Sequence, residues 1–188
     1  MFSRDKPSDL PCGILNDWDL TGKASVSHNT AASRRRTGTP PFMAIDLLTD
    51  DPPPHLYRHD LESFLYILVW AVVHYESNGQ ERPRNSILEN WTTGDLVDIQ
   101  SQKMAYLSLA HAFSAIMGAI TPAFKPKLSQ WISPLHLMFH QYKKTQEAKN
   151  VAVLLGRVPE GWDEETAGGT ISYEHFMKAL GESPDLDC

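Results

Sequence analysis

The sequence has few cysteines, fewer basic than acidic residues, and no apolar run long enough to span a membrane. Its 188 residues include two cysteines, Cys12 and Cys188. That is too few for a disulfide framework or a zinc site, and it favours a reducing compartment. The formal net charge is -6, whereas nucleic-acid binding requires a basic face. The N-terminus lacks the apolar region of a signal peptide. We therefore expect an intracellular protein, cytoplasmic or nuclear, that binds neither nucleic acid nor membrane.

The longest apolar run extends from Phe64 to Val73, within residues 59–76. The run is too short to cross a bilayer, which takes about 20 apolar residues. A surface helix has a single apolar stripe, whereas a helix that is apolar all round is buried. We therefore predict that residues 59–76 form a central helix buried on every side, with Asp60 at its entrance.

The sequence around this helix predicts a mainly α fold with a short strand at its start. Residues 12–20 are predicted to form the strand, and residues 21–41 a long polar loop. Loops of that length are uncommon in compact domains and are often functional. Further helices are predicted from helical spacing and capping residues over 42–48, 95–119, 133–144, 151–155 and 170–180.

Two groups of polar residues before the central helix are candidates for chemistry. Asp17 and Asp19 would share one face of a strand, and paired carboxylates can hold a hard cation such as Mg²⁺. On spacing alone, a solvated turn at the strand end is the better interpretation. The arginines at 34–36 precede Thr37, so this loop is either a phosphate-binding or phosphorylated site or an ordinary solvated basic loop.

The histidines give a weaker signal. His136 and His140 have the i, i+4 spacing that places two metal ligands on one helix face. The apolar residues between them favour packing instead. The sequence contains no G-x-S-x-G, Walker A or G-x-G-x-x-G motif. Taken singly, none of these signals identifies a function.

The order of the motifs is more specific than any one of them. The sequence I-L-N-D-W-D-L at 14–20 is followed by R-T-G-T-P-P-F-M-A-I-D-L-L at 36–48, and then by H-D-L-E-S-F-L-Y-I-L-V-W at 59–70. This succession resembles the C-terminal lobe of a protein kinase, and most of all the fungal-type protein kinase family. The resemblance extends from residue 1 to about residue 145 and is specific over residues 13–70.

The resemblance implies roles for residues in the first two motifs. Asp17 takes the place of the Mg²⁺-binding aspartate of the kinase D-F-G motif. Trp18 then stands for the phenylalanine, and Asp19 replaces the glycine as a second potential metal ligand. Gly38 and Thr39 fall in the part of the kinase activation segment that lines the substrate groove.

Two further aspartates would have structural roles. Asp46 stands where the A-P-E motif has its glutamate, which pairs with an arginine late in the lobe. Asp60 corresponds to the central-helix aspartate that accepts hydrogen bonds from the catalytic-loop backbone. The sequence does not encode that loop, and a buried aspartate without donors is costly. We therefore expect Asp60 to be reached by solvent or bonded to the segment just before it.

The implied architecture is a partial kinase domain, a helical bundle around a buried central helix with an N-terminal β-hairpin. It comprises the hairpin and metal motif (1–20), the activation segment (21–46) and a helical body (47–181), followed by a tail (182–188). On this alignment residues 1–2 end one strand of the hairpin, and the chain begins just after the catalytic loop.

The sequence contains no Gly-rich loop, strand lysine or H-R-D catalytic loop, which kinases need for phosphoryl transfer. No catalytic residue is therefore assigned. We expect a fragment of a serine/threonine kinase whose parent family uses ATP and Mg²⁺ and acts on protein substrates. The isolated chain is expected to be inactive and to bind neither cofactor. The alternative is a pseudokinase remnant that binds a protein partner.

Overall fold

The computed structural model describes residues 2–3, 12–13, 38–83, 85–157 and 160–184. The chain divides into two units, one ending at Ser33 and one beginning at Arg34, and each is described by itself. In the first unit, strands β1 (Phe2–Ser3) and β2 (Cys12–Gly13) pair antiparallel. This pairing agrees with the predicted N-terminal hairpin, whereas residues 4–11 and residues 14–20 of the predicted strand lie outside the described residues.

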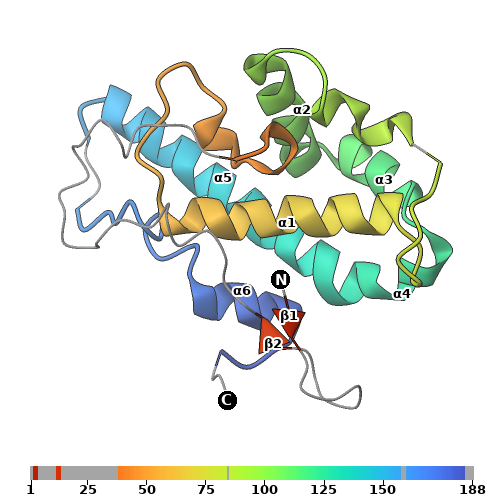
Figure 1. Cartoon of the computed structure of the whole chain (residues 1–188). Helices are drawn as coiled ribbons and strands as arrows, with labels where there is room; N and C mark the ends of the chain where they lie inside the picture. Colours follow the sequence, from red (N-terminus) through yellow and green to blue (C-terminus); the bar gives the residue numbers. More distant parts are fainter. Residues whose placement is uncertain (1, 4–11, 14–37, 84, 158–159, 185–188) are drawn as a thin grey trace. The chain divides into compact units, whose positions relative to one another are not determined.

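The described part of the second unit is helical, which confirms the predicted mainly α class (Figure 1). Its α-helices are α1 (Tyr57–His74), α2 (Leu96–Ser108), α3 (Ala110–Gly118), α4 (Lys125–Lys127), α5 (Ser133–Leu154) and α6 (Tyr173–Leu180). Between them lie the 3₁₀ turns η2 (Pro40–Phe42), η3 (Ile45–Leu47), η4 (Ser86–Trp91) and η5 (Pro122–Phe124), and the π turn η6 (Leu128–Ile132).

Helix α1 crosses the middle of this unit in front of α5 (Figure 1). It begins two residues earlier than predicted because His59 caps its first turn. The Nδ1 atom of His59 accepts a hydrogen bond from the backbone N–H of Leu56 at 3.1 Å, which satisfies one of the donors left unpaired at a helix start. The helix ends at His74, and Tyr75 then forms a β-bridge with Glu81.

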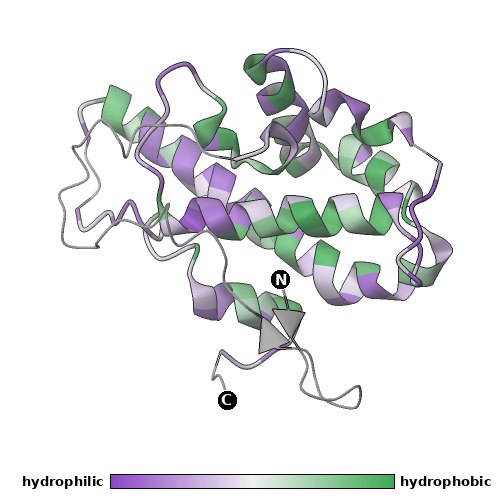
Figure 2. Ribbon diagram, in the orientation of Figure 1, coloured by the Kyte–Doolittle hydropathy of each residue, from purple (hydrophilic) through white to green (hydrophobic). Residues whose placement is uncertain are grey.

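The prediction that α1 is buried on every side is wrong. Its buried apolar residues follow the spacing of a single helix face and are Leu61, Leu65, Tyr66, Val69, Val72 and Val73. On other sides of the helix, Phe64 is 54% exposed and Ile67 is 44% exposed. The apolar character of α1 is visible as green ribbon in Figure 2. Within the described residues, the helical body therefore covers only part of α1.

Two other predicted helices differ from the structure at their ends. The predicted helix over 95–119 is broken at Leu109, whose extended backbone separates α2 from α3. Ser133 does not act as an N-cap, because the π turn η6 leads directly into α5. That helix continues to Leu154 and so includes the start of the separate helical turn predicted at 151–155.

The last helix agrees more closely with the sequence. The Ser172 hydroxyl accepts a hydrogen bond from the His175 N–H at 3.2 Å and caps α6. Gly181, with φ +78°, ends the helix as predicted. The predicted helix over 42–48 is instead two 3₁₀ turns, η2 and η3, separated by the extended residues Met43 and Ala44.

Candidate functional site

The segment from Gly38 to Leu48 combines an exposed start with a buried end. Gly38 and Thr39 are exposed, whereas Met43 and Leu48 are buried. Gly38 has φ +123°, and a Cβ atom there would lie 3.2 Å from the Met43 Cγ. A side chain at this position would therefore be strained both by its backbone and by its neighbour. The segment turns sharply so that Gly38 and Thr39 stay at the surface.

Side chains from α2 bind the carbonyl groups of this segment. The Nζ atom of Lys103 donates to the Pro40 carbonyl at 2.9 Å and to the Met43 carbonyl at 2.6 Å. The Nε2 atom of Gln100 donates to the Ile45 carbonyl at 3.0 Å. The carbonyls of Pro40 and Ile45 each also accept a backbone N–H within the 3₁₀ turns. Buried carbonyl groups need hydrogen-bond partners, and helix α2 supplies one to each of the three.

The Lys103 ammonium is fully buried among aromatic rings. It lies 4.1 Å from the centroid of the Tyr66 ring and 5.8 Å from that of Trp91. Burial lowers the pKa of Lys103 from 10.5 to about 7, while the negative charge of Glu62 opposes this shift. Lys103 is thus a cation whose charge changes near neutral pH.

Glu62 of α1 holds the other side of the segment. Its Oε1 atom accepts hydrogen bonds from the Ile45 N–H at 2.9 Å and from the Tyr66 hydroxyl at 2.7 Å. Its Oε2 atom lies 3.6 Å from the Nζ of Lys143, and the residue is fully buried. A buried carboxylate with these partners fixes the backbone of Ile45 between α1 and α2.

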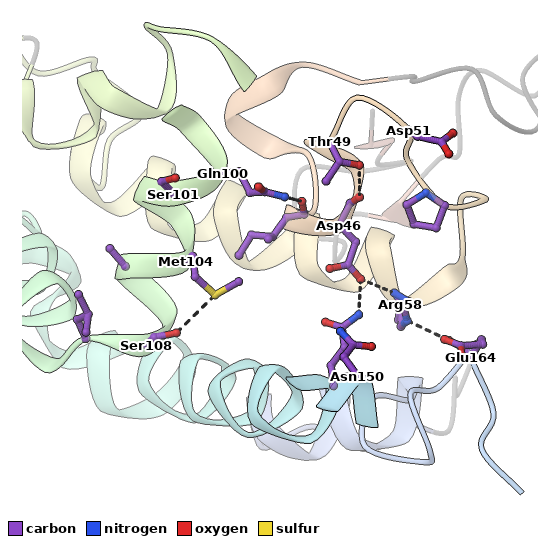
Figure 3. Close-up of a pocket in the computed structure, with 15 residues that line it drawn as sticks. Asp46, Thr49, Asp51, Arg58, Gln100, Ser101, Met104, Ser108, Asn150 and Glu164 are labelled. Carbon is purple, nitrogen blue, oxygen red and sulfur yellow. Dashed lines mark hydrogen bonds and ion pairs between the residues drawn. The ribbon is translucent and has the colours of Figure 1, made fainter. Parts of the chain in front are cut away.

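Asp46 follows Ile45 and is the centre of a second cluster of charged residues. Its Oδ1 atom accepts from Lys143 at 2.8 Å. Its Oδ2 atom accepts from Arg58 at 3.1 Å, from the Tyr142 hydroxyl at 2.9 Å and from Gln146 at 2.9 Å. Arg58 also donates through Nε to the Glu164 carbonyl at 2.9 Å (Figure 3). Asp46 therefore ties the segment to the start of α1 and to α5.

The pKa of Asp46 reflects these partners. Burial acts to raise it, but the charge of Lys143 and hydrogen bonds from His59, Lys143 and Gln146 outweigh that effect. The pKa of Asp46 is consequently held well below its usual value. The carboxyl group is ionised at neutral pH and neutralises the cations that face it.

A pocket of ≈ 840 Å³ lies beside Asp46, between this segment, α2 and α5 (Figure 3). Its lining combines charged, polar and apolar side chains, among them Asp46, Arg58, Gln100, Met104, Asn150 and Glu164. The pocket is large enough to take side chains of a bound polypeptide. Thus the turn that exposes Gly38 and Thr39 leads to a segment that borders a cavity.

Asp60 is outside both charged clusters. Its side chain is 57% exposed, and its Oδ1 atom pairs with the Nε2 of His55 at 2.9 Å. The hydrogen bond that His55 donates to Asp60 raises the pKa of His55. We expected Asp60 to be reached by solvent or bonded to the preceding segment, and both are observed. The buried acid of the H-D-L-E-S sequence is Glu62.

The remaining predicted residues fall into two groups. Asp17, Trp18, Asp19 and Thr37 lie outside the described residues. His136 and His140 are described, and their ring nitrogens donate to the carbonyls of Tyr106 at 2.9 Å and Leu107 at 2.7 Å. These histidines therefore join α5 to α2, in agreement with the packing interpretation. In the described part of the chain, no group of three or more His, Cys, Asp or Glu residues could hold a metal.

Three residues of these clusters were not predicted from the sequence: Glu62, Lys103 and Lys143. The position of Glu62 could have been predicted from helical spacing. It precedes Leu65 by three residues and Tyr66 by four, which places it on the same helix face as both. The positions of Lys103 and Lys143 could not have been predicted in this way, because nothing in their neighbouring residues distinguishes them from exposed lysines. Their positions depend on contacts with residues far away in the sequence.

The comparison with known families finds a match to one family of protein kinases, over the first part of the chain. Residues 1–72 match the model of the family described as fungal protein kinase. The matched residues include the three motifs at 14–20, 36–48 and 59–70. The resemblance seen in the sequence is confirmed over these residues, whereas the looser part, from residue 73 to about 145, lies outside the match. No curated protein and no solved structure matches the chain.

Among the described residues, no helix is both long and apolar enough to cross a bilayer. This agrees with the short length of the apolar run in α1, which falls below the roughly 20 residues that a membrane span needs.

Proposed function

We propose that the chain forms the C-terminal lobe of a fungal-type serine/threonine protein kinase, in which the segment from Gly38 to Asp46 receives the protein substrate. The observation that supports this most strongly is the family match over residues 1–72, because it includes this segment and the start of α1. The anchoring of the segment by Glu62 and Lys103 gives independent physical support. It is the arrangement expected of a surface that must keep one shape to bind a partner.

The contacts explain how the surface would work. Gly38 and Thr39 are exposed, while the carbonyls of Pro40, Met43 and Ile45 are already bonded to α2. A substrate that binds a surface fixed in this way loses less free energy to ordering the protein. In this proposal the segment positions the substrate, and no residue of this chain transfers a proton.

The cofactors of the parent family, ATP and Mg²⁺, would be bound through the metal motif. Asp17 is the residue that would hold Mg²⁺, with Asp19 beside it, and two carboxylates match the oxygen ligands that Mg²⁺ prefers. When bound, Mg²⁺ would neutralise charge on the transferred phosphate. The sequence contains no Gly-rich loop or strand lysine to hold the nucleotide, so we expect no binding of ATP by this chain alone.

The first test measures phosphoryl transfer by the purified 188-residue protein. With ATP, Mg²⁺ and a generic serine/threonine peptide, we expect no transfer above the rate without enzyme, because the H-R-D aspartate and the catalytic-loop asparagine are absent from the sequence. Asp17→Ala serves as the matched control. Transfer that disappears in Asp17→Ala would show that the chain is itself a kinase and would overturn this part of the proposal.

Substrate binding is tested separately from catalysis. Serine/threonine peptides from a library are expected to bind the wild-type chain weakly, and Gly38→Val is expected to weaken the binding about tenfold or more, because a side chain at φ +123° distorts the turn. Isothermal titration measures the affinity, with Gly79→Val as a control at an exposed glycine with space around it. Equal affinities for the two variants would contradict the assignment of the segment as a substrate surface.

A second candidate function is a pseudokinase remnant that binds a protein partner. The specific observation in its favour is the exposure of Phe64 and Ile67 on α1. Large apolar side chains on one exposed helix face are typical of interaction surfaces. This candidate differs from the first in requiring the exposed face of α1 rather than the segment at Gly38.

The exposed face of α1 can be tested by mutation. The double variant Phe64→Ser and Ile67→Ser is expected to fold normally and to self-associate less than the wild type, because it removes exposed apolar surface without opening the core. Sedimentation velocity measures association, and circular dichroism checks the fold. Val97→Ser, at a 53% exposed position on α2, is the control. If both proteins associate equally, α1 is not an interaction surface.

A further inference from the structure

We propose that Lys103 is a positioning residue whose protonated side chain fixes the conformation of residues 40–45, so that the shape of the candidate substrate surface depends on pH. The biological meaning of this inference rests on the proposed function of that segment. The contacts on which it depends, and the experiment that tests it, do not.

The Lys103 side chain bonds two points of the segment at once, and we call this arrangement the Lys103 clamp. One ammonium group bonds two carbonyls, those of Pro40 and Met43, on either side of the turn η2. The same group lies over the Tyr66 ring at 4.1 Å. Hydrogen bonds from an ionised donor are roughly twice as strong as those between neutral groups, and a desolvated cation gains further from an aromatic face. The Lys103 ammonium therefore ties both ends of the turn to α2, in addition to the backbone hydrogen bonds of the turn itself.

The groups that face Lys103 do not hold it in one protonation state. From α1, the carboxylate of Glu62 supplies negative charge, but Glu62 also lies 3.6 Å from Lys143. Tyr66 of α1 and Tyr106 of α2 have pKa values raised by burial, so both stay neutral at physiological pH. The segment itself presents carbonyl groups, while the Asp46 carboxylate is bonded to Arg58 and other donors. Glu62 is thus the charge that favours the protonated form.

Loss of the proton would weaken the clamp without removing it. A neutral amine still has two N–H groups for the carbonyls of Pro40 and Met43, but it loses the charge that strengthens both bonds. It also loses the attraction to the Tyr66 ring. Because the pKa of Lys103 is about 7, the change takes place close to neutral pH. The segment is expected to be well ordered below this value and looser above it.

Amide hydrogen exchange of the wild-type protein tests the inference directly. Protection factors, corrected for the intrinsic effect of pH on exchange, are compared for the amides of Phe42, Met43 and Ile45. We expect protection to fall roughly tenfold between about pH 6 and about pH 8.5, as two charge-assisted bonds weaken. Amides within α5 are the internal reference and should change little. Protection at residues 42–45 that does not change across this range would overturn the proposal.

Variants separate the charge from the general packing of the helix. Lys103→Met keeps most of the side-chain volume, and it is expected to lower protection at 42–45 by about tenfold at the lower pH and to abolish the pH dependence. Lys127→Met is the matched control, since Lys127 also contacts an aromatic ring, that of Trp131 at 4.5 Å, and bonds Gln130. A pH step that persists in Lys103→Met would assign it to another group and overturn the proposal. If this variant does not fold, the wild-type profile decides alone.

The two proposals can fail separately. Hydrogen exchange requires no substrate, nucleotide or activity. A flat pH profile would remove the role of Lys103 and leave the peptide-binding test at Gly38 unaffected. Conversely, a chain that binds no peptide would remove the substrate surface, while a pH step at 42–45 would still establish the clamp.

Discussion

Replacing Asp46 with alanine is expected to lower the free energy of unfolding by about 3–5 kcal/mol. In the wild type, the Asp46 carboxylate pairs with Arg58 and Lys143, whose side chains are only 4% and 6% exposed. Its removal leaves two buried cations facing each other, with Glu62 as the remaining acid at 3.6 Å from Lys143. Breaking a buried ion pair from one side costs far more than the pair itself contributes, because the partner stays buried without compensation.

Asp60→Ala is the matched control for this prediction. Asp60 also pairs with a basic side chain, that of His55, but Asp60 is 57% exposed and His55 is 38% exposed. Exposed pairs contribute about 0–1 kcal/mol, so this variant should unfold nearly as the wild type does. Urea unfolding of all three proteins measures the difference. If the two alanine variants lose similar stability, the cluster around Asp46 does not hold the segment as described.

The comparison of these two aspartates also shows how far the sequence could predict the site. The kinase resemblance pointed to Asp46 and Asp60, and it led us to expect an Asp60 that is reached by solvent or bonded to the preceding segment, as the structure shows. It did not reveal that Glu62, two residues later, is the buried acid that bonds the Ile45 backbone. Helical geometry places Glu62 on the face of Tyr66, so the position was predictable once the buried face of α1 was known. The bond partner was not, because Ile45 is 17 residues away in sequence.

The exposed face of α1 shows a limit of periodicity arguments. An uninterrupted run of apolar residues contains no polar positions to mark which side faces solvent. Hydropathy alone therefore predicted burial on every side, and the structure shows Phe64 and Ile67 exposed. Which side is covered depends on where the other helices pack, and that information is distributed over the whole chain.

Local signals succeeded where a single residue type determines the backbone. Gly181 ends α6 because a glycine readily adopts positive φ at a helix end. The break between α2 and α3 had no such signal, since Leu109 is an ordinary residue in a run of helix formers. The turn from α2 to α3 is fixed instead by tertiary contacts, including the bonds from His136 and His140 to the carbonyls of Tyr106 and Leu107. Tertiary packing of this kind overrides propensity.

The second large effect concerns the pH dependence of stability and follows from Lys103. The free energy of unfolding of the wild type, relative to Lys103→Met, is expected to rise by about 3 kcal/mol from about pH 7 to about pH 9.5. The pKa of Lys103 is about 7 in the folded protein, against 10.5 for an ordinary lysine. Between these values the unfolded chain binds a proton that the folded protein does not, so raising the pH favours the folded protein.

This sign is opposite to that of a lysine stabilised by an ion pair, whose contribution disappears as the pH rises. It is also opposite to the local effect on residues 40–45, which should loosen over the same range because their carbonyls lose a charged donor. Urea unfolding at a series of pH values measures the first effect, and hydrogen exchange measures the second. Parallel stability curves for the wild type and Lys103→Met would mean that the ammonium is not desolvated. A rise in global stability together with a fall in protection at 40–45 is the combination expected when the proton is costly to bury and when the segment opens while Lys103 itself stays buried.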